Sequence, residues 1–154
     1  MGIILIAILI AIDQFTKYIA IKYLAMGTPI VFIDNFLQLN YTENYGAAWS
    51  ILEGKQMLLT LISLGIILGI LWFKWKEQTK GALNLALDMI IAGALGNLID
   101  RLLRGFVVDF IDVKFGNLYD YPVFNFADVF IVIGTFIFAY FILFNKYDFE
   151  KGKQ

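Results

Sequence analysis

Most of the side chains that could do chemistry lie in one otherwise apolar stretch of the chain, from Ala92 to Asp128. They are Asn97, Asp100, Arg101, Asp109, Asp112, Asn125 and Asp128. The chain contains no histidine and no cysteine, which excludes imidazole and thiolate nucleophiles, imidazole-bound zinc and disulfides. Hydrolysis would therefore depend on carboxylates, lysine, tyrosine or serine. A metal site built from carboxylates alone is the less favoured alternative, and we expect no metal and no cofactor.

Paired aspartates provide one such chemistry. Two carboxylates in close contact cannot both ionise easily, so they share one proton. The ionised member can deprotonate a water, while the protonated member polarises a peptide carbonyl and later protonates the leaving amine. Such a pair titrates as a unit, and the sequence leaves open which aspartate holds the proton.

The composition is that of an integral membrane protein. Of the 154 residues, 60% are hydrophobic and 16% charged, with a mean hydropathy of +0.76. Soluble domains are nearer ~45–50% apolar and ~25% charged. We therefore expect one membrane-embedded domain over residues 1–154. The net charge of -1 argues against a nucleic-acid partner.

Four apolar stretches are long enough to cross a bilayer, which takes ~20 residues. They cover residues 2–24, 56–75, 82–103 and 123–144. A cleaved signal peptide is an alternative for the first, disfavoured because no basic residues precede it and polar residues follow. The mainly α fold is completed by a small β-sheet between the first two helices, predicted from partial alternation in residues 28–52, with a turn at Asp34-Asn35. Its open edge could pair with an extended peptide. Residues 104–122 are expected to form an outer loop that could close over the site.

Basic residues favour a cytoplasmic location for the second inter-helix loop and the tail. These are Lys74, Lys76 and Lys80, and Lys146, Lys151 and Lys153. Both termini would then be cytoplasmic, and Asp13 would join the polar residues of the central stretch in the outer half of the membrane. Isolated charges at such depth each cost ~2.5–3.5 kcal/mol. The shared depth therefore predicts one polar pocket at the outer leaflet.

Several polar residues allow a structural and a functional interpretation. Lys17 lies one helical turn after Asp13, so the two form either an ion pair or part of the site. Asn44 is either a turn residue or a substrate contact. Asn125 and Asp128 resemble a capping box at a helix start, which does not exclude catalysis because the helix dipole favours an ionised acid there.

Other residues are expected to shape the third helix. Asn97, Asp100 and Arg101 share one face at its outer end, with Asp100 and Arg101 as an ion pair that shapes the pocket. Gly93 and Gly96 allow close helix approach. Asp88, nearer the inner end, would snorkel or pair with a loop lysine, and it has no functional interpretation.

Five blocks of the sequence, in the same order and spanning nearly the whole chain, resemble the signal peptidase II (lipoprotein signal peptidase) family of bacterial membrane aspartyl proteases. The blocks are DQFTK from Asp13, NYGAAW from Asn44, AGALGNLIDR from Ala92, VVDFID from Val107 and FNFAD from Phe124. The first is weak alone, but GNLIDR followed by VVDFID and FNFAD is highly specific. Ala92 replaces a frequent glycine and Asp88 falls in a usually apolar stretch, which leaves the packing of the third helix open.

The resemblance implies four transmembrane helices with a periplasmic β-cradle, in the bacterial inner membrane. It implies cleavage of prolipoprotein signal peptides just before a diacylglyceryl-modified cysteine, at the outer leaflet among membrane lipids. Globomycin-like inhibitors would occupy the same site. By motif match, the catalytic pair is Asp109 and Asp128. Supporting or substrate-binding residues would be Asp13, Lys17, Asn44, Asn97, Asp100, Arg101 and Asn125.

Two other functions are compatible with intramembrane carboxylates. A proton-coupled transporter would place acids along the whole membrane depth, whereas only Asp88 lies near the inner half. A membrane assembly factor could use the glycines as helix contacts but would not need two aspartates at one site. The clustering therefore favours a peptidase.

Overall fold

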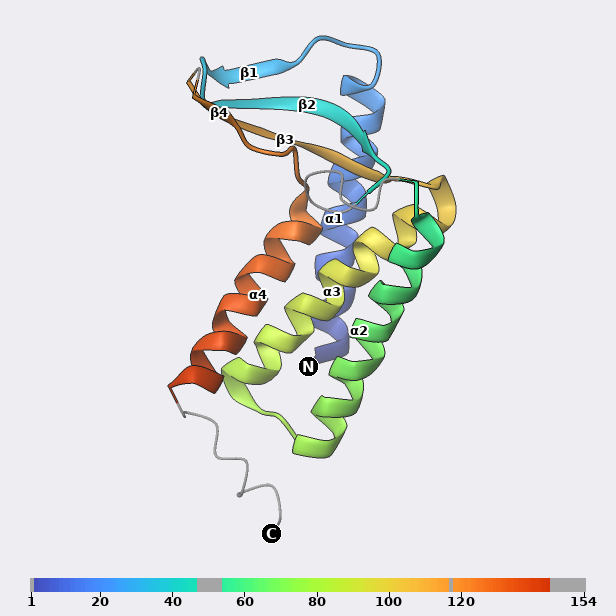
Figure 1. Cartoon of the computed structure of the whole chain (residues 1–154), viewed down its shortest axis with the longest axis vertical. Helices are drawn as coiled ribbons and strands as arrows, with labels where there is room; N and C mark the ends of the chain where they lie inside the picture. Colours follow the sequence, from blue (N-terminus) through green and yellow to red (C-terminus); the bar gives the residue numbers. More distant parts are fainter. Residues whose placement is uncertain (1, 47–53, 117, 145–154) are drawn as a thin grey trace.

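Four long helices and a small sheet make up the computed structural model (Figure 1), which describes residues 2–46, 54–116 and 118–144. The elements are α1 (Gly2–Leu24), β1 (Ile30–Ile33), β2 (Leu37–Asn44), α2 (Gln56–Glu77), α3 (Gly81–Arg104), β3 (Val107–Phe115), β4 (Tyr119–Asp120) and α4 (Phe126–Leu143). Each helix is long and apolar enough to cross a membrane. The predicted mainly α fold with four spanning helices is confirmed. The fourth helix begins at Phe126, three residues later than expected, because Asn125 is extended and caps it.

Helix α3 is the centre of the bundle. It packs against α1, α2 and α4, and 67% of its apolar window is buried, compared with 17% or less in the other three helices. A Cβ on Gly93 would collide with the carbonyl oxygen of Ala127, and one on Gly96 would lie 2.6 Å from Asp13 Oδ2. The prediction that these glycines permit close approach is confirmed, so α1 and α4 reach the backbone of α3.

The four strands form one antiparallel sheet in the order β1-β2-β3-β4. The predicted turn is present, and Asn35 occupies it with a φ of 57°, which asparagine tolerates. The predicted sheet between α1 and α2 is present as β1 and β2, and it extends beyond that connection. Half of its strands come from the connection between α3 and α4, and β3 pairs with β2 so that Thr42 faces Asp109. Of the expected region 28–52, residues 47–52 lie outside the described residues.

The segment expected to be an outer loop and a lid is therefore mostly strand. Residues 107–110 are buried consecutively, since one face of β3 packs on α1 and the other on the site. Val108 and Phe110 join Ala20 and Leu24 of α1 in a core cluster. Backbone pairing along nearly the whole of β3 fixes this segment, so residues 107–115 form a strand and not the expected loop.

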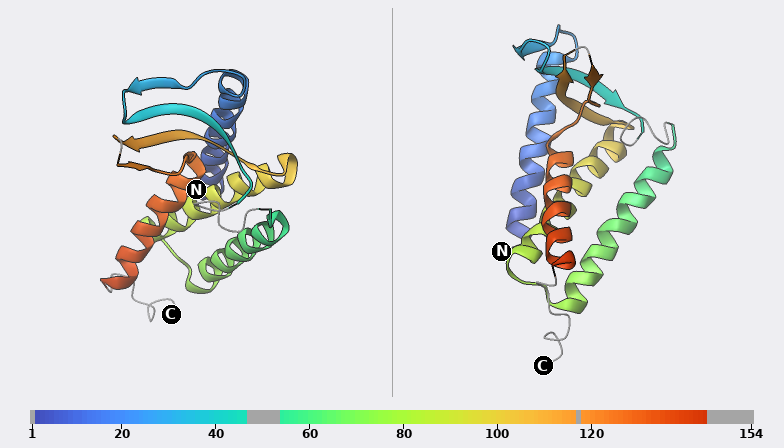
Figure 2. Two further views of the ribbon diagram at one scale, coloured as in Figure 1. Left: turned by 45° about the horizontal axis from the view of Figure 1, so that its top comes forward. Right: turned by 60° about the vertical axis from the view of Figure 1, so that its left-hand side comes forward.

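The sheet covers one end of the bundle, and the first turn of α1 and the last turn of α4 lie at the other (Figure 1). The two turned views in Figure 2 show the same separation, with β3 lying over the ends of α1 and α4. Lys74 and Lys76 are in the last turn of α2, at the end opposite the sheet. The tail lysines fall outside the described residues.

Candidate active site

Asp109 lies in the middle of β3 with its carboxylate turned into the protein. The residue is 2% exposed. Its Oδ1 accepts a hydrogen bond of 2.6 Å from Asn125 Nδ2, and its Oδ2 accepts one of 2.8 Å from Asn44 Nδ2. Asn44 ends β2, so the pairing of β2 with β3 brings this amide to the acid. Both oxygens of Asp109 are thus held by side-chain amides.

Asp128 stands in the first turn of α4, three residues after the cap. Asn125 Oδ1 accepts from the backbone N–H of Asp128 at 3.0 Å, and Asp128 Oδ2 accepts from the N–H of Asn125 at 3.1 Å. The capping box predicted from sequence is therefore present. The other oxygen, Oδ1, accepts a bond of 2.8 Å from Asn97 Nδ2. One carboxylate thus caps the helix and also faces α3.

Two asparagine amides connect the acids. Asn97 Oδ1 accepts from Asn125 Nδ2 at 3.1 Å, so each amide contacts one acid directly and also contacts the other amide. Burial, followed by the negative charge of Asp128, raises the pKa of Asp109 to about 7, although hydrogen bonds from Asn44 and Asn125 oppose the shift. Asp109 therefore titrates near neutral pH, as a group that takes part in acid–base hydrolysis should.

A fully buried lysine contacts one of the two amides that hold this pair of acids. Lys17 Nζ lies 3.0 Å from Asp13 Oδ2, 2.9 Å from Asp100 Oδ2 and 2.9 Å from Asn97 Oδ1. Its three N–H groups thus meet three acceptors, and the predicted ion pair between Asp13 and Lys17 is confirmed. Because Lys17 donates to Asn97 Oδ1, the amide nitrogen of Asn97 must point toward Asp128.

The two acids that hold Lys17 also bind backbone of the surrounding elements. Asp13 Oδ1 accepts from the N–H of Ala127 at 2.9 Å, at the start of α4. Asp100 Oδ2 accepts from the N–H of Val108 at 3.1 Å, at the start of β3. The cluster therefore fixes α1, α3, α4 and β3 relative to one another, and with them the two catalytic candidates.

The predicted ion pair between Asp100 and Arg101 is wrong. Asp100 pairs with Lys17 and Arg104, whereas Arg101 donates to the carbonyl of Gly46 at 3.2 Å. Adjacent helical residues point about 100° apart, whereas residues four apart face each other. The i,i+4 spacing of Asp100 and Arg104 was the signal that could have identified this partner. The charges of both candidate acids still act on the guanidinium of Arg101, and its buried Nε has no hydrogen-bond partner among the described residues.

Gln14 is a second residue that sequence reasoning missed. Its Nε2 donates to Asp13 Oδ2, to the carbonyl of Gly96 and to Asp100 Oδ1, at 3.1 to 3.2 Å. Arg104 in turn contacts Gln14 Oε1. The one signal in the sequence that could have identified Gln14 is its position next to Asp13 in the DQFTK block.

Asp88 belongs to the opposite end of the bundle. It pairs with Lys74 of α2 and accepts from Asn84 Nδ2 at 2.9 Å, so the predicted lysine partner is confirmed. Lys74 lies on the last turn of the helix rather than in a loop. Within residues 2–46, 54–116 and 118–144, no group of three or more acidic side chains is arranged to hold a metal ion.

Four apolar helices and a buried, amide-bound pair of carboxylates define a multi-pass membrane protein with groups suited to acid–base hydrolysis. Residues 5–144 match the family model described as signal peptidase (SPase) II. The chain belongs to the signal peptidase II family, and the family supports a peptidase activity.

Relatives cover almost the entire chain. The lipoprotein signal peptidase of Clostridium novyi (strain NT) is 43% identical over 135 residues, covering 87% of this chain and 91% of the relative. That of Clostridium acetobutylicum is 40% identical over 154 residues, covering 99% of each. A solved bacterial membrane enzyme superposes with a TM-score of 0.86 at 37% identity, covering 94% of this chain and 88% of that one. The likeness therefore includes the sheet as well as the helices.

Proposed function

We propose that the protein removes the signal peptide from diacylglyceryl-modified prolipoproteins, cleaving just before the lipidated cysteine. Asp109 and Asp128 are the proposed catalytic pair. The observation that carries the proposal is their shared environment: two linked amides each bind one of the acids, and the charge of Asp128 helps to raise the pKa of Asp109. The family membership supports the substrate class.

The reaction needs one ionised and one protonated carboxylate. The ionised acid takes a proton from water, and the resulting hydroxide attacks the scissile carbonyl carbon while the protonated acid donates a hydrogen bond to its oxygen. The tetrahedral intermediate then expels the amine, which takes the proton of the initially protonated acid, and the proton taken from water replaces it within the pair. Asp109, with a pKa of about 7, is suited to hold the shared proton in the free enzyme. Asn97 and Asn125 orient the two carboxylates throughout.

The arrangement of the helices supports a site at the outer leaflet of the bacterial inner membrane. Helix α1 begins and helix α4 ends on the side opposite the sheet (Figure 1), where Lys74 and Lys76 also lie, and basic residues favour the cytoplasmic side. The acids would then meet a lipidated peptide that already resides in the outer leaflet. Globomycin-type inhibitors would compete for the same pocket.

The test is cleavage of a purified diacylglyceryl prolipoprotein by the detergent-purified enzyme. Asp109→Asn and Asp128→Asn should each lower kcat by on the order of 10²–10⁴-fold, the usual range for an acid–base group. Asp112→Asn is the matched control, because Asp112 is also buried in β3 but binds Gln38 instead of the asparagines. Cleavage at the wild-type rate by either dyad variant would refute the assignment.

A further inference from the structure

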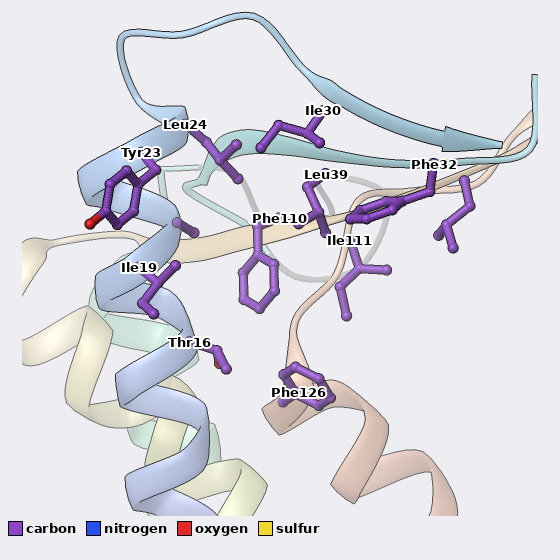
Figure 3. Close-up of a pocket in the computed structure, with 12 residues that line it drawn as sticks. Thr16, Ile19, Tyr23, Leu24, Ile30, Phe32, Leu39, Phe110, Ile111 and Phe126 are labelled. Atoms are coloured by element: carbon purple, nitrogen blue, oxygen red, sulfur yellow. The ribbon is translucent and has the colours of Figure 1, made fainter. Parts of the chain in front are cut away.

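An apolar groove lies beneath the sheet, beside the outer end of α1 (Figure 3). Its volume is about 410 Å³, within the ~300–1,000 Å³ typical of ligand sites. It is lined by twelve residues from α1, the sheet and the start of α4, and we call it the α1–sheet groove. None of these residues contributes a side chain to the hydrogen-bonded site around Asp109 and Asp128. The groove is therefore a separate feature of the fold.

The lining suits hydrocarbon rather than peptide. Ten of the twelve residues are aliphatic or phenylalanine, and the exceptions are Thr16 and Tyr23. The hydroxyl of Thr16 already donates within its own helix, to the carbonyls of Ile12 at 2.9 Å and Asp13 at 2.8 Å. A peptide segment brings N–H and C=O groups that need partners away from water, whereas an acyl chain needs none.

The groove lies at the depth where the acyl chains of a bilayer lipid begin, just below the headgroups. Tyr23 and Leu24 at the end of α1 and Phe126 at the start of α4 line it, so it lies where two spanning helices meet the membrane surface. Lys22 is in the last turn of α1, exposed, with Nζ 5.2 Å from the ring of Tyr23. A lysine and a tyrosine at this level are typical anchors at the headgroup boundary.

We propose that the α1–sheet groove holds one acyl chain of an anionic glycerophospholipid of the bilayer, with its phosphate against Lys22. Bilayer lipid is the occupant because the groove lies beside a spanning helix, accepts hydrocarbon and carries a cation at its rim. The substrate's own lipid is the competing occupant. The pocket that includes Asp128 opens between β3 and α4 instead, and it is lined by a different set of residues.

The bound chain has a structural consequence for the site. Strand β1 pairs only with β2 within the described sheet, and its four residues are all exposed. Ile30 and Phe32 of β1 and Leu39 of β2 turn an apolar face toward the groove (Figure 3). A chain beneath them would hold β2 against the bundle, and β2 carries the Asn44 amide that binds Asp109.

The experiment measures lipid retention and thermal unfolding of the full-length protein in mild detergent. Delipidated protein is titrated with dioleoyl phosphatidylglycerol, with zwitterionic dioleoyl phosphatidylcholine and with dihexanoyl phosphatidylglycerol, which has the headgroup but not the long chains. Native mass spectrometry counts bound lipids. Ile19→Trp fills the groove, and Tyr18→Trp is the matched control, because Tyr18 is exposed on the same helix and does not line the groove. Lys22→Gln removes the cation.

The expected result is one tightly held long-chain phosphatidylglycerol, which raises the unfolding midpoint by roughly 5–10 °C at a hundredfold excess over Kd. The Ile19→Trp variant should lose it, and the Tyr18→Trp variant should keep it. Lys22→Gln should remove the preference over phosphatidylcholine. Equal retention by both tryptophan variants, or equal binding of the short-chain lipid, would overturn the proposal. Displacement of the lipid by a diacylglyceryl-cysteine peptide would also overturn it, because the groove would then belong to the substrate.

Discussion

The hydrogen bond from Asn44 to Asp109 provides a direct test of which acid holds the proton. Asn44 Nδ2 donates to Asp109 Oδ2 at 2.8 Å, and this bond stabilises the ionised form of the acid. Replacing Asn44 with alanine removes it, so the pKa of Asp109 should rise above its present value of about 7. A substitution at the end of a strand should thereby extend activity into more alkaline solution.

The size of the effect follows from the strength of the lost bond. A hydrogen bond to a charged group contributes ~1.5–3 kcal/mol, and one pKa unit corresponds to ~1.4 kcal/mol. The pKa should therefore rise by ~1–2 units, with water that replaces the amide favouring the lower value. The proposed dyad would be inactive once its shared proton is lost, so this pKa should govern the alkaline side of the rate profile.

The assay is the pH dependence of kcat/KM on a diacylglyceryl prolipoprotein, which reports on the free enzyme. Wild-type activity should fall as pH rises through about 7, and the alkaline limb of Asn44→Ala should move upward by ~1–2 units. Asn40→Ala is the control, since Asn40 lies in the same strand and makes no side-chain hydrogen bond to the described residues. An alkaline limb that stays in place or moves downward in Asn44→Ala would refute the assignment of the proton to Asp109.

Three further substitutions test the scaffold around the acids. Lys17→Met leaves buried Asp13 without a cation and Asp100 with Arg104 alone, and should lower the free energy of unfolding by ~3–5 kcal/mol, measured by titration with a denaturing detergent. Gly96→Ala places a Cβ 2.6 Å from a carboxylate oxygen and should cost ~1–3 kcal/mol, whereas Gly69→Ala, with open space around it, should be neutral or stabilising in the same titration. Asp88→Asn breaks the pair with Lys74 at the far end of the bundle, so the unfolding midpoint should fall while kcat stays at the wild-type value.

The sequence was sufficient for the helices because membrane spans are set by length and hydropathy alone. Gly2–Leu24 begins and ends where the apolar pattern predicted. The third strand was harder to predict because β3 is buried on both faces over residues 107–110, and the fourth has only two residues. Burial on both faces removes the alternation by which a strand is recognised. A run such as Val107–Phe110 then looks like part of a loop between two helices.

Local spacing predicted pairs within an element, but not the partners that tertiary packing supplies. Asp13 and Lys17 are four residues apart in one helix, and so are Asp100 and Arg104. The other two acceptors of Lys17, on Asn97 and Asp100, come from a different helix, α3. No periodicity carries that information, because it depends on how closely Gly96 lets α1 approach.

The charges of the site explain why it should hold one proton. The site contains four carboxylates, on Asp13, Asp100, Asp109 and Asp128, and two cations bonded to them, Lys17 and Arg104. A third cation, Arg101, acts on Asp100, Asp109 and Asp128 through its charge and donates its hydrogen bond to the carbonyl of Gly46. Asp112, also buried, binds Gln38 and is not connected to the site through the described contacts. Net charge in a dry interior is costly, so these groups are neutral together when one carboxylate is protonated. Charge balance with the three cations therefore favours a single proton on the proposed dyad, and neutralising Lys17 should draw in a second proton and remove the base.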